Sequence, residues 1–456
     1  MAAPLTARGR SGLTATVLKV MGIFGGVQVL TILCAIARTK FVALWIGPVG
    51  VGLFGIYNSA LDMVKSVSQL GIGESAVRDL ANSPKGRVAA VVLSLRRWSW
   101  ALGVIGAVAM LALSGFLSVM SFGDSSHAWE FMLLSVCVLL SSLSAAEGAV
   151  FRGFRRFRKL ARASVWGAVG GLAVSIPMFY LWRQESIVPS IIAYTVVTWL
   201  ALGLYREKVD KPEGKLPLGE SFSIGKGFVV LGTFMTASLF INNLVTYIFL
   251  AWLNSEGGEG VVGLYQAGFT LVSKYVGLIF TAIAVEYYPR LSAVAHSPRR
   301  LALFAGHEIR LIMWILMGAV PVFILADGLI VRLLYSSDFV EMLPYVGWAA
   351  VGTVFRAYGW CLGFTILAKG DGATYLWTEA LSAALSLGLS MAGYAYCGWL
   401  GLGVAYIVWF GVYSVIVSVV ARRRYGIRLP YPSLLLTILA LAVALGAALL
   451  RTYLAY

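Results

Sequence analysis

Residues Val261–Leu291, VVGLYQAGFTLVSKYVGLIFTAIAVEYYPRL, decide the fold class of this chain. The stretch exceeds the roughly 20 apolar residues that cross a bilayer as a helix. One charge, Lys274, stands in its middle, and Glu286 begins its polar and aromatic end. A lysine at the centre of a membrane helix costs about 2.5–3.5 kcal/mol to insert. Such a residue usually faces a helix-bundle interior or a watery cavity, so we expect a membrane helix that carries a functional cation.

A related stretch occurs earlier in the chain. VGLF at positions 51–54 leads into an apolar segment that carries Lys65, as VGLY at 262–265 leads into the segment that carries Lys274. The two motifs lie 211 positions apart in a chain of 456 residues. This offset is close to half the length, and it predicts two halves that repeat one helical scheme.

The composition is that of a polytopic membrane protein. Hydrophobic residues make up 59% of the chain and charged residues only 12%, with a mean hydropathy of +0.85; soluble domains average about 25% charged residues. Long continuous apolar runs indicate helices rather than barrel strands. The four cysteines have no metal-ligand spacing, so we expect small buried residues and neither a metal site nor a disulfide framework.

Thirteen apolar segments can be placed along the chain, six on each side of a charged linker and one more at the C-terminal end. The expected segments cover about 13–37, 49–76, 98–120, 129–150, 163–182, 188–205, 224–253, 261–286, 311–335, 343–368, 376–397, 401–421 and 433–450. The corresponding regions are an N-terminal lobe 1–205, a cytoplasmic linker 206–221, a C-terminal lobe 222–428 and an additional transmembrane segment within 429–456. Whether the thirteenth run crosses the membrane is left open by the sequence.

The distribution of Lys and Arg supports this topology. With the N-terminus in the cytoplasm, 26 of them fall on the cytoplasmic side and five, including Arg38 and Lys40, on the outer side. This bias is the positive-inside pattern of inner-membrane proteins. It also accounts for most of the net charge of +16 without nucleic acid. The basic run 151–159 is interpreted in the same way, as a topology signal that touches anionic lipid.

Three cations fall near the midpoints of their expected segments: Lys65, Lys274 and Arg356. Asp62 precedes Lys65 by three residues on the same helical face, so these two side chains can pair. The remaining excess of about two positive charges suits a cavity for an anionic ligand. In the structural alternative, these cations tie helices together through backbone carbonyls.

Other polar residues in or near the segments have weaker interpretations. Glu74 and Glu286 stand at inner ends of segments, whereas Gln28, Asn242 and Asn243 either line a polar lumen or bridge helices. No HExxH, Walker A or GxSxG pattern and no pair of catalytic carboxylates occurs. We therefore assign no catalytic residue and expect no cofactor, which argues against an ATP-driven pump and against an enzyme.

Three stretches resemble a known family. GPVGVGLF at 47–54, LGIG at 70–73 and above all TAIAVEYYPRLS at 281–292 are similar to the polysaccharide-transporter flippases of the Wzx type. These belong to the multidrug/oligosaccharidyl-lipid/polysaccharide exporter (MOP) superfamily. The resemblance implies an all-α polytopic membrane protein with two six-helix bundles related by pseudo-two-fold symmetry around a central cavity. The thirteenth segment is additional to that twelve-helix core.

The resemblance also implies a function. The expected substrate is an undecaprenyl-pyrophosphate-linked oligosaccharide, such as an O-antigen or related repeat unit, moved from the cytoplasmic to the periplasmic leaflet of a bacterial inner membrane by alternating access. Membrane lipids and the polysaccharide polymerase machinery are the implied partners. Lys65, Lys274 and Arg356 would hold the pyrophosphate, because Arg binds phosphate bidentately and Lys as a point charge.

Two alternatives belong to other functional classes. A drug or cation antiporter of the same superfamily would need carboxylates at the membrane midplane, whereas the expected midplane charges are net positive. A membrane-bound glycosyltransferase or O-antigen ligase would carry a large loop, but no expected outer loop exceeds about 15 residues.

Overall fold

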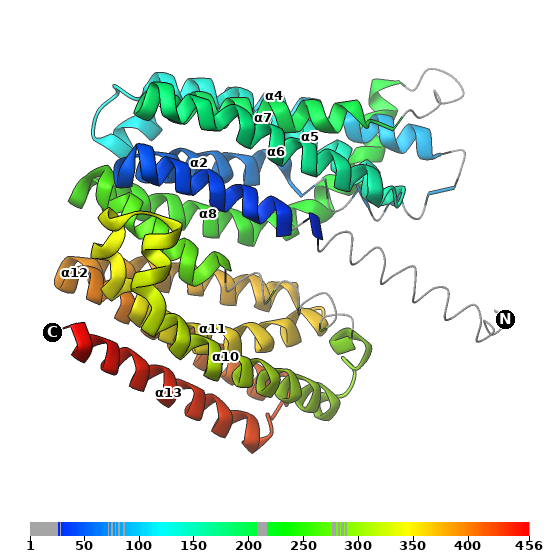
Figure 1. Cartoon of the computed structure of the whole chain (residues 1–456). Coiled ribbons are helices and arrows are strands. Elements are labelled where there is room, and N and C mark those ends of the chain that lie inside the picture. Colours follow the sequence, from blue (N-terminus) through cyan, green and yellow to red (C-terminus); the bar gives the residue numbers. More distant parts are fainter. Residues whose placement is uncertain are drawn as a thin grey trace. The chain divides into compact units, whose positions relative to one another are not determined.

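The described residues form helices joined by turns and short loops, and they contain no strand (Figure 1). The computed structural model describes residues 26–455 except 28, 72, 74–75, 78, 81–82, 85–86, 208–216, 276–279, 281–282, 284–286 and 288–289, and it does not describe the side chains of 218, 225, 227–235, 274–275 and 455. Within this part of the chain, eight helices are long and apolar enough to cross a membrane by length and composition. The prediction of an all-α, multi-pass membrane protein is confirmed.

The chain divides into two compact units. Unit 1 comprises Met1–Ile46 and Tyr57–Phe240, and unit 2 comprises Gly47–Ile56 and Ile241–Tyr456. Two helices, α2 and α8, therefore contribute residues to both units.

Unit 1 is built from paired antiparallel helices. Besides the helical residues 29–45, its elements are the later part of α2 (Gly47–Gln69), α4 (Val88–Phe122), α5 (Ala128–Gly153), α6 (Phe157–Trp182), η1 (Arg183–Ser186), α7 (Ile187–Leu204) and the first part of α8 (Leu218–Phe269). α4 packs on α5 and α6 on α7, and α5 also contacts α7. Ser99 and Ser142 link α4 to α5, because each hydroxyl donates to the other residue's carbonyl, at 3.2 and 3.0 Å.

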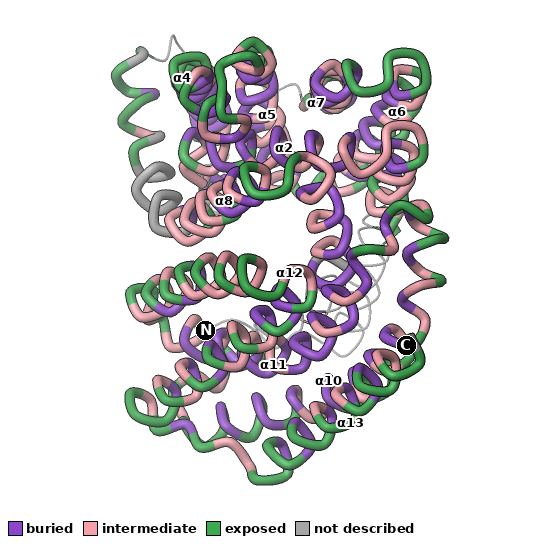
Figure 2. The backbone as a smooth tube through the Cα atoms, turned by 90° about the vertical axis from the view of Figure 1, so that its left-hand side faces the viewer, coloured by how far each residue is buried: buried purple, intermediate pink, exposed green. Residues whose placement is uncertain are grey.

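Unit 2 is organised around one buried helix. Its later elements are η2 (Thr270–Tyr275), α10 (Pro298–Leu334), η3 (Ser337–Met342), α11 (Leu343–Ala368), α12 (Gly372–Tyr425) and α13 (Tyr431–Ala455). α11 contacts α10, α12 and α13. None of its residues is exposed, which Figure 2 shows as a tube of buried and intermediate colours. The bounds of α11 coincide with the predicted segment 343–368.

Two glycines divide the longest helices. α8 contains Gly258 at φ 77° and ψ 177°, and α12 contains Gly398 at φ 54° and ψ −133°. Only glycine adopts such angles without a steric penalty. α12 therefore holds the predicted segments 376–397 and 401–421 on either side of a turn, and α8 holds 224–253 and the first part of 261–286. Gly47, which starts α2, has φ 79° and stands 211 positions before Gly258.

α2 and the second half of α8 cross at their glycines, inside unit 2. A Cβ added to Gly52 would lie 1.9 Å from the carbonyl oxygen of Glu259, and one added to Gly263 would lie 1.8 Å from that of Pro48. The two backbones are thus in direct contact, an approach that small residues make possible in membrane helix pairs. The repeated motifs VGLF and VGLY pack against each other.

α13 runs parallel to α10 along its length. Near the start of both helices, Ser433 Oγ donates to the carbonyl of Gly306 at 2.9 Å. Near their ends, Arg451 Nε lies 3.0 Å from Asp327 Oδ2. The span Tyr431–Leu454 meets the length and hydropathy of a membrane-crossing helix.

Three predicted boundaries were wrong. α4 begins at Val88, before the predicted segment 98–120, and α10 begins at Pro298, before the predicted segment 311–335. Both helices extend beyond their apolar cores into charged sequence, and Ser297 caps α10 by accepting from the backbone N–H of Arg300. α2 ends earlier than predicted, at Gln69, because Leu70 adopts the left-handed conformation at φ 44°.

Candidate functional site

Arg356 lies at the middle of α11 and connects three elements of unit 2. Its Nη1 donates to the carbonyl of Ser273 in η2 at 2.9 Å and to the hydroxyl of Tyr406 in α12 at 3.4 Å. The hydroxyls of Ser273 and Tyr406 are themselves 3.0 Å apart. The guanidinium is partly buried. The mid-helix position predicted for Arg356 is therefore observed, and so is the contact with a backbone carbonyl that the structural alternative required.

The carbonyl that Arg356 contacts belongs to a π-helical turn. η2 covers Thr270–Tyr275, directly after α8. A π turn widens the helix and frees backbone groups from the regular ladder, and such turns occur frequently at functional sites. Arg356 supplies a charged donor to this turn. The backbone of Lys274 belongs to the same turn, next to Ser273, whereas its side chain lies outside the described residues.

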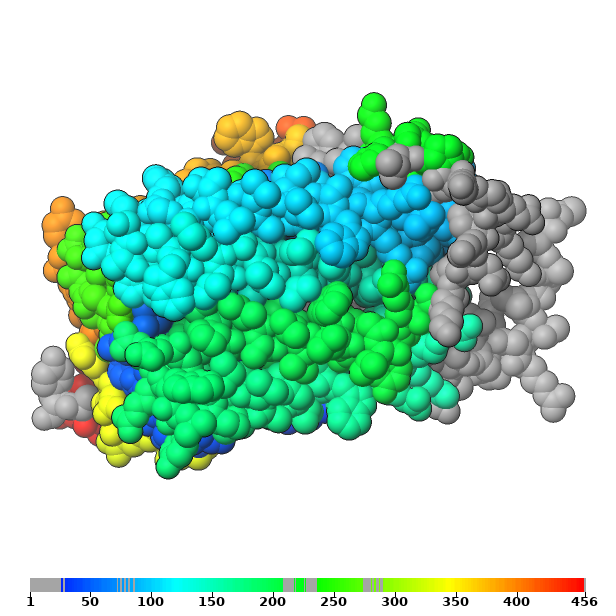
Figure 3. Space-filling model, turned by 90° about the horizontal axis from the view of Figure 1, so that it is seen from above, coloured from blue at the N-terminus to red at the C-terminus, as the bar shows by residue number. Residues whose placement is uncertain are grey.

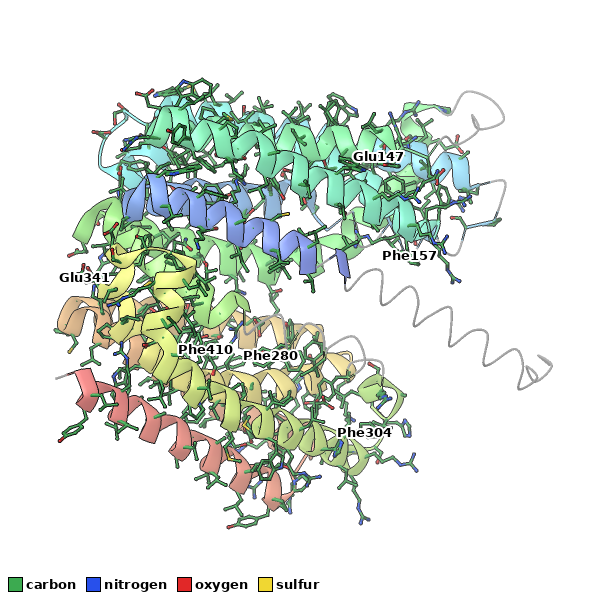
Figure 4. The ribbon with its side chains drawn as sticks, in the orientation of Figure 1. Glu147, Phe157, Phe280, Phe304, Glu341 and Phe410 are labelled. Carbon is green, nitrogen blue, oxygen red and sulfur yellow. The ribbon has the colours of Figure 1, made fainter. Side chains whose placement is uncertain are left out.

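Aromatic rings surround the guanidinium of Arg356. Its Cζ lies 5.6 Å from the ring centroid of Phe280 and 5.7 Å from that of Phe410, both labelled in Figure 4. Phe410 stacks on Trp409 at 4.2 Å. Cations within about 6 Å of an aromatic face are attracted by its quadrupole. The cluster therefore holds a permanent positive charge in an apolar, aromatic setting.

Lys65 forms the predicted pair with Asp62 in unit 1. Its Nζ lies 3.6 Å from Asp62 Oδ1, and the Asp62 side chain is 60% exposed. Lys65 stands close to the end of α2 at Gln69, not near its midpoint as predicted, because the helix is shorter than the predicted segment. Solvent therefore partly screens this ion pair, which lies near the end of α2.

Arg38 is a buried cation that the sequence analysis placed on the outer side. It belongs to the helical residues 29–45, which continue past the predicted segment end at position 37. Its Nη2 lies 3.4 Å from Ser190 Oγ, and its Cζ lies 4.7 Å from the ring centroid of Tyr194. The charge of Arg38 is therefore held against a helix of unit 1 by a hydroxyl and an aromatic ring.

Glu379 in α12 is a carboxylate that the sequence analysis did not single out. The Tyr413 hydroxyl donates to its Oε1 at 2.8 Å, and three residues further along α12 the Trp409 indole donates to Ser382 Oγ at 2.9 Å. The side chain of Glu379 is partly buried. The signal that could have revealed it was a single acidic residue inside the predicted segment 376–397.

The remaining predicted residues are distributed over the chain. Asn242 and Asn243 are partly buried on α8 in unit 2. Gln28, Glu74 and Glu286 lie outside the described residues. The described part of the chain contains no group of three His, Cys, Asp or Glu side chains that could hold a metal ion. Cys34, Cys137 and Cys361 are buried as predicted, but Cys397 is exposed beside the turn at Gly398.

A match to a protein-family model shows the family of this chain. The family model described as polysaccharide biosynthesis protein matches residues 41–344, about two thirds of the chain. The chain belongs to this family. No curated protein sequence matches this polysaccharide biosynthesis protein.

Solved structures show the same fold at low sequence identity. An inward-facing multidrug resistance MATE family transporter of the MOP superfamily is 15% identical, with 87% of this chain and 94% of that chain covered and a TM-score of 0.73. The lipid II flippase MurJ, in an inward closed conformation, is 11% identical, with coverages of 95% and 98% and a TM-score of 0.66. A MOP superfamily transporter from Pyrococcus furiosus, whose binding pocket is described as reversed in polarity, is 16% identical, with coverages of 89% and 94% and a TM-score of 0.61. The polysaccharide biosynthesis protein therefore has the fold of MOP-superfamily membrane transporters and flippases.

Proposed function

We propose that this polysaccharide biosynthesis protein is a flippase for an undecaprenyl-pyrophosphate-linked oligosaccharide. It moves the O-antigen or a related repeat unit from the cytoplasmic to the periplasmic leaflet of a bacterial inner membrane by alternating access, with its N-terminus in the cytoplasm. Membership of the polysaccharide biosynthesis protein family supports a lipid-linked glycan as the substrate class. The fold shared with the lipid II flippase supports the transport of a lipid-linked sugar.

The observation that carries the proposal is the cation at Arg356. A pyrophosphate bears roughly two negative charges and cannot cross about 30 Å of hydrocarbon without charge compensation. Arg356 provides a permanent charge in the middle of a buried helix, with its guanidinium between hydrogen-bond acceptors and aromatic rings. We assign Lys274, in the adjacent π turn, and Lys65 to the same ligand.

Each cation has a separate role in this proposal. The planar guanidinium of Arg356 can hold phosphate oxygens bidentately, whereas Lys65 and Lys274 act as movable point charges. The Asp62 carboxylate, which lies 3.6 Å from Lys65 Nζ, is released when a phosphate takes its place. The polyprenyl tail remains in lipid throughout, and the exported glycan passes to the polymerase machinery.

Complementation of a flippase-null strain tests this function. The full chain should restore surface polysaccharide, and purified protein in vesicles should carry a short-chain polyprenyl-pyrophosphate glycan to the opposite leaflet. Variants Arg356→Gln and Lys65→Gln should each reduce that transfer without lowering the amount of protein in the membrane. Wild-type protein that restores no glycan and moves no polyprenyl-pyrophosphate substrate would rule the proposal out.

Glu379 favours a second candidate, a drug or cation antiporter of the same superfamily. A carboxylate within a membrane helix is expected to bind a proton or a cation, and in the described part of the chain Glu379 accepts a hydrogen bond from the Tyr413 hydroxyl. The antiporter predicts efflux of cationic dyes that depends on a proton or sodium gradient and is lost in Glu379→Gln. Dye efflux without glycan transfer would favour this candidate over the flippase.

A further inference from the structure

A groove with a charged end runs along the surface of unit 1. Its volume is about 320 Å³, and we call it the α4–α7 groove. It is lined by Arg96, Ser99 and Trp100 of α4, Leu143, Ala146 and Glu147 of α5, Trp199, Leu200, Gly203 and Leu204 of α7, and Arg206 after α7. Figure 3 shows the face of unit 1 on which α4 and α5 lie beside α6 and α7.

The long walls of the groove are apolar and open. Trp100, Leu200 and Leu204 are exposed. Gly203, which lines the groove, is exposed and has nothing within 4 Å of the position of a Cβ, so the space beside it is open. Tryptophans at such a site typically lie at the boundary between hydrocarbon and headgroups. These walls therefore present a surface suited to a hydrocarbon chain.

One end of the groove is cationic. Arg96 binds Glu147, labelled in Figure 4, in a bidentate pair, with Nε to Oε1 at 2.8 Å and Nη2 to Oε2 at 2.9 Å. Arg206 Nε lies 3.0 Å from the same Oε1, and the Arg206 side chain is 54% exposed. Two guanidinium groups thus share one carboxylate, so these three side chains carry a net charge of +1 at the groove end.

A second ionic cluster adjoins this end. The Glu207 carboxylate lies 3.4 Å from Arg156 Nε and 2.9 Å from Lys159 Nζ, and the Glu207 carbonyl accepts from Arg96 Nη2 at 3.2 Å. Here again two cations share one carboxylate. Among the described residues, the two clusters together therefore have four cations and two carboxylates, an excess of two positive charges next to an apolar groove.

Unit 2 has a pocket of similar volume at the corresponding place. By order in the chain, α4, α5 and α7 correspond to α10, α11 and the second half of α12, and α5 and α11 each have 26 residues. This pocket of about 330 Å³ is lined by Tyr358 and Leu362 of α11, Ser418, Ala421 and Arg422 of α12, Ile427, Arg428 and Leu429 after α12, and Leu434 of α13. The start of α13 therefore forms part of its wall, whereas in the described part of unit 1 no additional helix lines the groove.

We propose that the α4–α7 groove binds an anionic phospholipid. One acyl chain lies along α5 and α7 beside Gly203, and the phosphate contacts Arg206 at the cationic end. Basic pockets between membrane helices bind anionic headgroups on the side where polybasic segments gather. A zwitterionic lipid or a transmembrane helix would leave the excess positive charge uncompensated. The proposal does not depend on which substrate the protein transports.

The test uses the purified full chain in nanodiscs and measures bound lipid by native mass spectrometry, with phosphatidylglycerol compared with phosphatidylcholine. Arg206→Ala should weaken phosphatidylglycerol binding about fivefold, the change that one cation near a membrane surface confers. Phosphatidylcholine binding should be unchanged. Gly203→Phe should remove binding of both lipids, because its ring occupies the chain position and no charge is altered.

Matched controls separate the site from general surface effects. Arg424→Ala removes an equally exposed arginine that pairs with Asp371 outside the groove, and Gly115→Phe adds a ring at another open helical glycine. Both should bind lipid as the wild type does. The proposal is overturned if Arg206→Ala and Gly203→Phe retain wild-type phosphatidylglycerol, or if inorganic phosphate alone displaces it. A protein dimer that Gly203→Phe dissociates would assign the groove to a second copy and would also overturn it.

Discussion

Gly52 and Gly263 each stand where the backbone of the other's helix passes, in the crossing of α2 and α8. The position of a Cβ on Gly263 lies 2.9 Å from the amide nitrogen of Gly52. The two glycines are 211 positions apart and come from the repeated motifs that first suggested two related halves. The two copies of the repeated motif, at 51–54 and 262–265, are therefore in contact with each other.

Substitution of a glycine at this crossing should lower the stability of the protein. Gly263→Ala places a methyl group 1.8 Å from the Pro48 carbonyl oxygen, so the helices must separate. We expect a loss of about 1–3 kcal/mol in stability, the usual range for overpacking, seen as a lower thermal unfolding temperature in detergent. The control Gly446→Ala adds the same methyl group to α13, where nothing lies within 4 Å. Equal unfolding temperatures for Gly263→Ala and the control would contradict the observed crossing.

Arg356 should need its guanidinium geometry as well as its charge. Arg356→Lys keeps the cation but cannot reproduce the contacts to Ser273 and Tyr406. We expect glycan transfer to fall about 10–100-fold in Arg356→Gln, the effect of losing a charged hydrogen bond, and to fall less in Arg356→Lys. Arg332→Gln, at an exposed position of α10, should have no effect. Full transfer by well-expressed Arg356→Gln would remove this residue from the proposed site.

Lys274 should contribute to glycan transfer through its positive charge. Lys274→Ala should insert as well as or better than the wild type, because a lysine within a membrane helix costs a few kcal/mol, and yet lose transfer. Lys274→Arg should retain part of the activity, and Lys369→Ala, at the end of α11, should retain all of it. The measurement is surface polysaccharide relative to protein in the membrane. Normal output from Lys274→Ala would remove this lysine from the ligand site.

The ion pair between Asp327 and Arg451 should hold α13 in place. Asp327 is only 3% exposed, and removing one member of a buried pair typically costs about 3–5 kcal/mol. We therefore expect Arg451→Met to lower the unfolding temperature strongly. The double variant Arg451→Met with Asp327→Leu should recover much of this loss, because no buried charge remains. A double variant as unstable as the sum of both single variants would show that the pair is not coupled.

Asp371, before α12, should give the protein a sensitivity to acid. The backbone N–H of Thr374 and the hydroxyl of Tyr425 donate to its carboxylate, and Arg424 lies nearby; these contacts lower the pKa of Asp371 to about 2. An unfolded aspartate has a pKa near 3.9, so the stabilisation is present above about pH 4 and is lost as the pH falls towards 2. Thermal unfolding of Asp371→Asn should lack this part of the pH dependence. An unchanged profile would contradict the assignment.

Sequence patterns predicted the helices better than the side-chain environments. Apolar runs locate helices because each span must satisfy its own backbone in lipid, and α11 was predicted to the residue. Helix ends were less certain, since α4 and α10 continue into charged sequence outside the apolar run. The contacts between helices depend on rotation and tilt, which hydropathy does not encode.

In the candidate site, too, contacts within one helix could be predicted and contacts between helices could not. Periodicity predicted the pair of Lys65 and Asp62 because both lie on one helix. The first segment was predicted to end before Arg38 because a hydropathy window ends at the first charge, even where the helix continues and buries that charge against Tyr194. The aromatic setting of Arg356 brings together residues from elements far apart in sequence, which a single sequence does not reveal.

The pairing of α13 with α10 sets an order of events during synthesis. Arg451 is made 124 residues after Asp327, and at about 5–20 residues per second the ribosome needs roughly 6–25 s to cover that interval. During this time the nascent chain contains Asp327 but not yet Arg451, so the carboxylate lacks its ion-pair partner. Unit 2 therefore cannot reach its final packing until the last helix is inserted. A nascent chain stalled before position 451 would present this unfinished surface to membrane proteases and insertases.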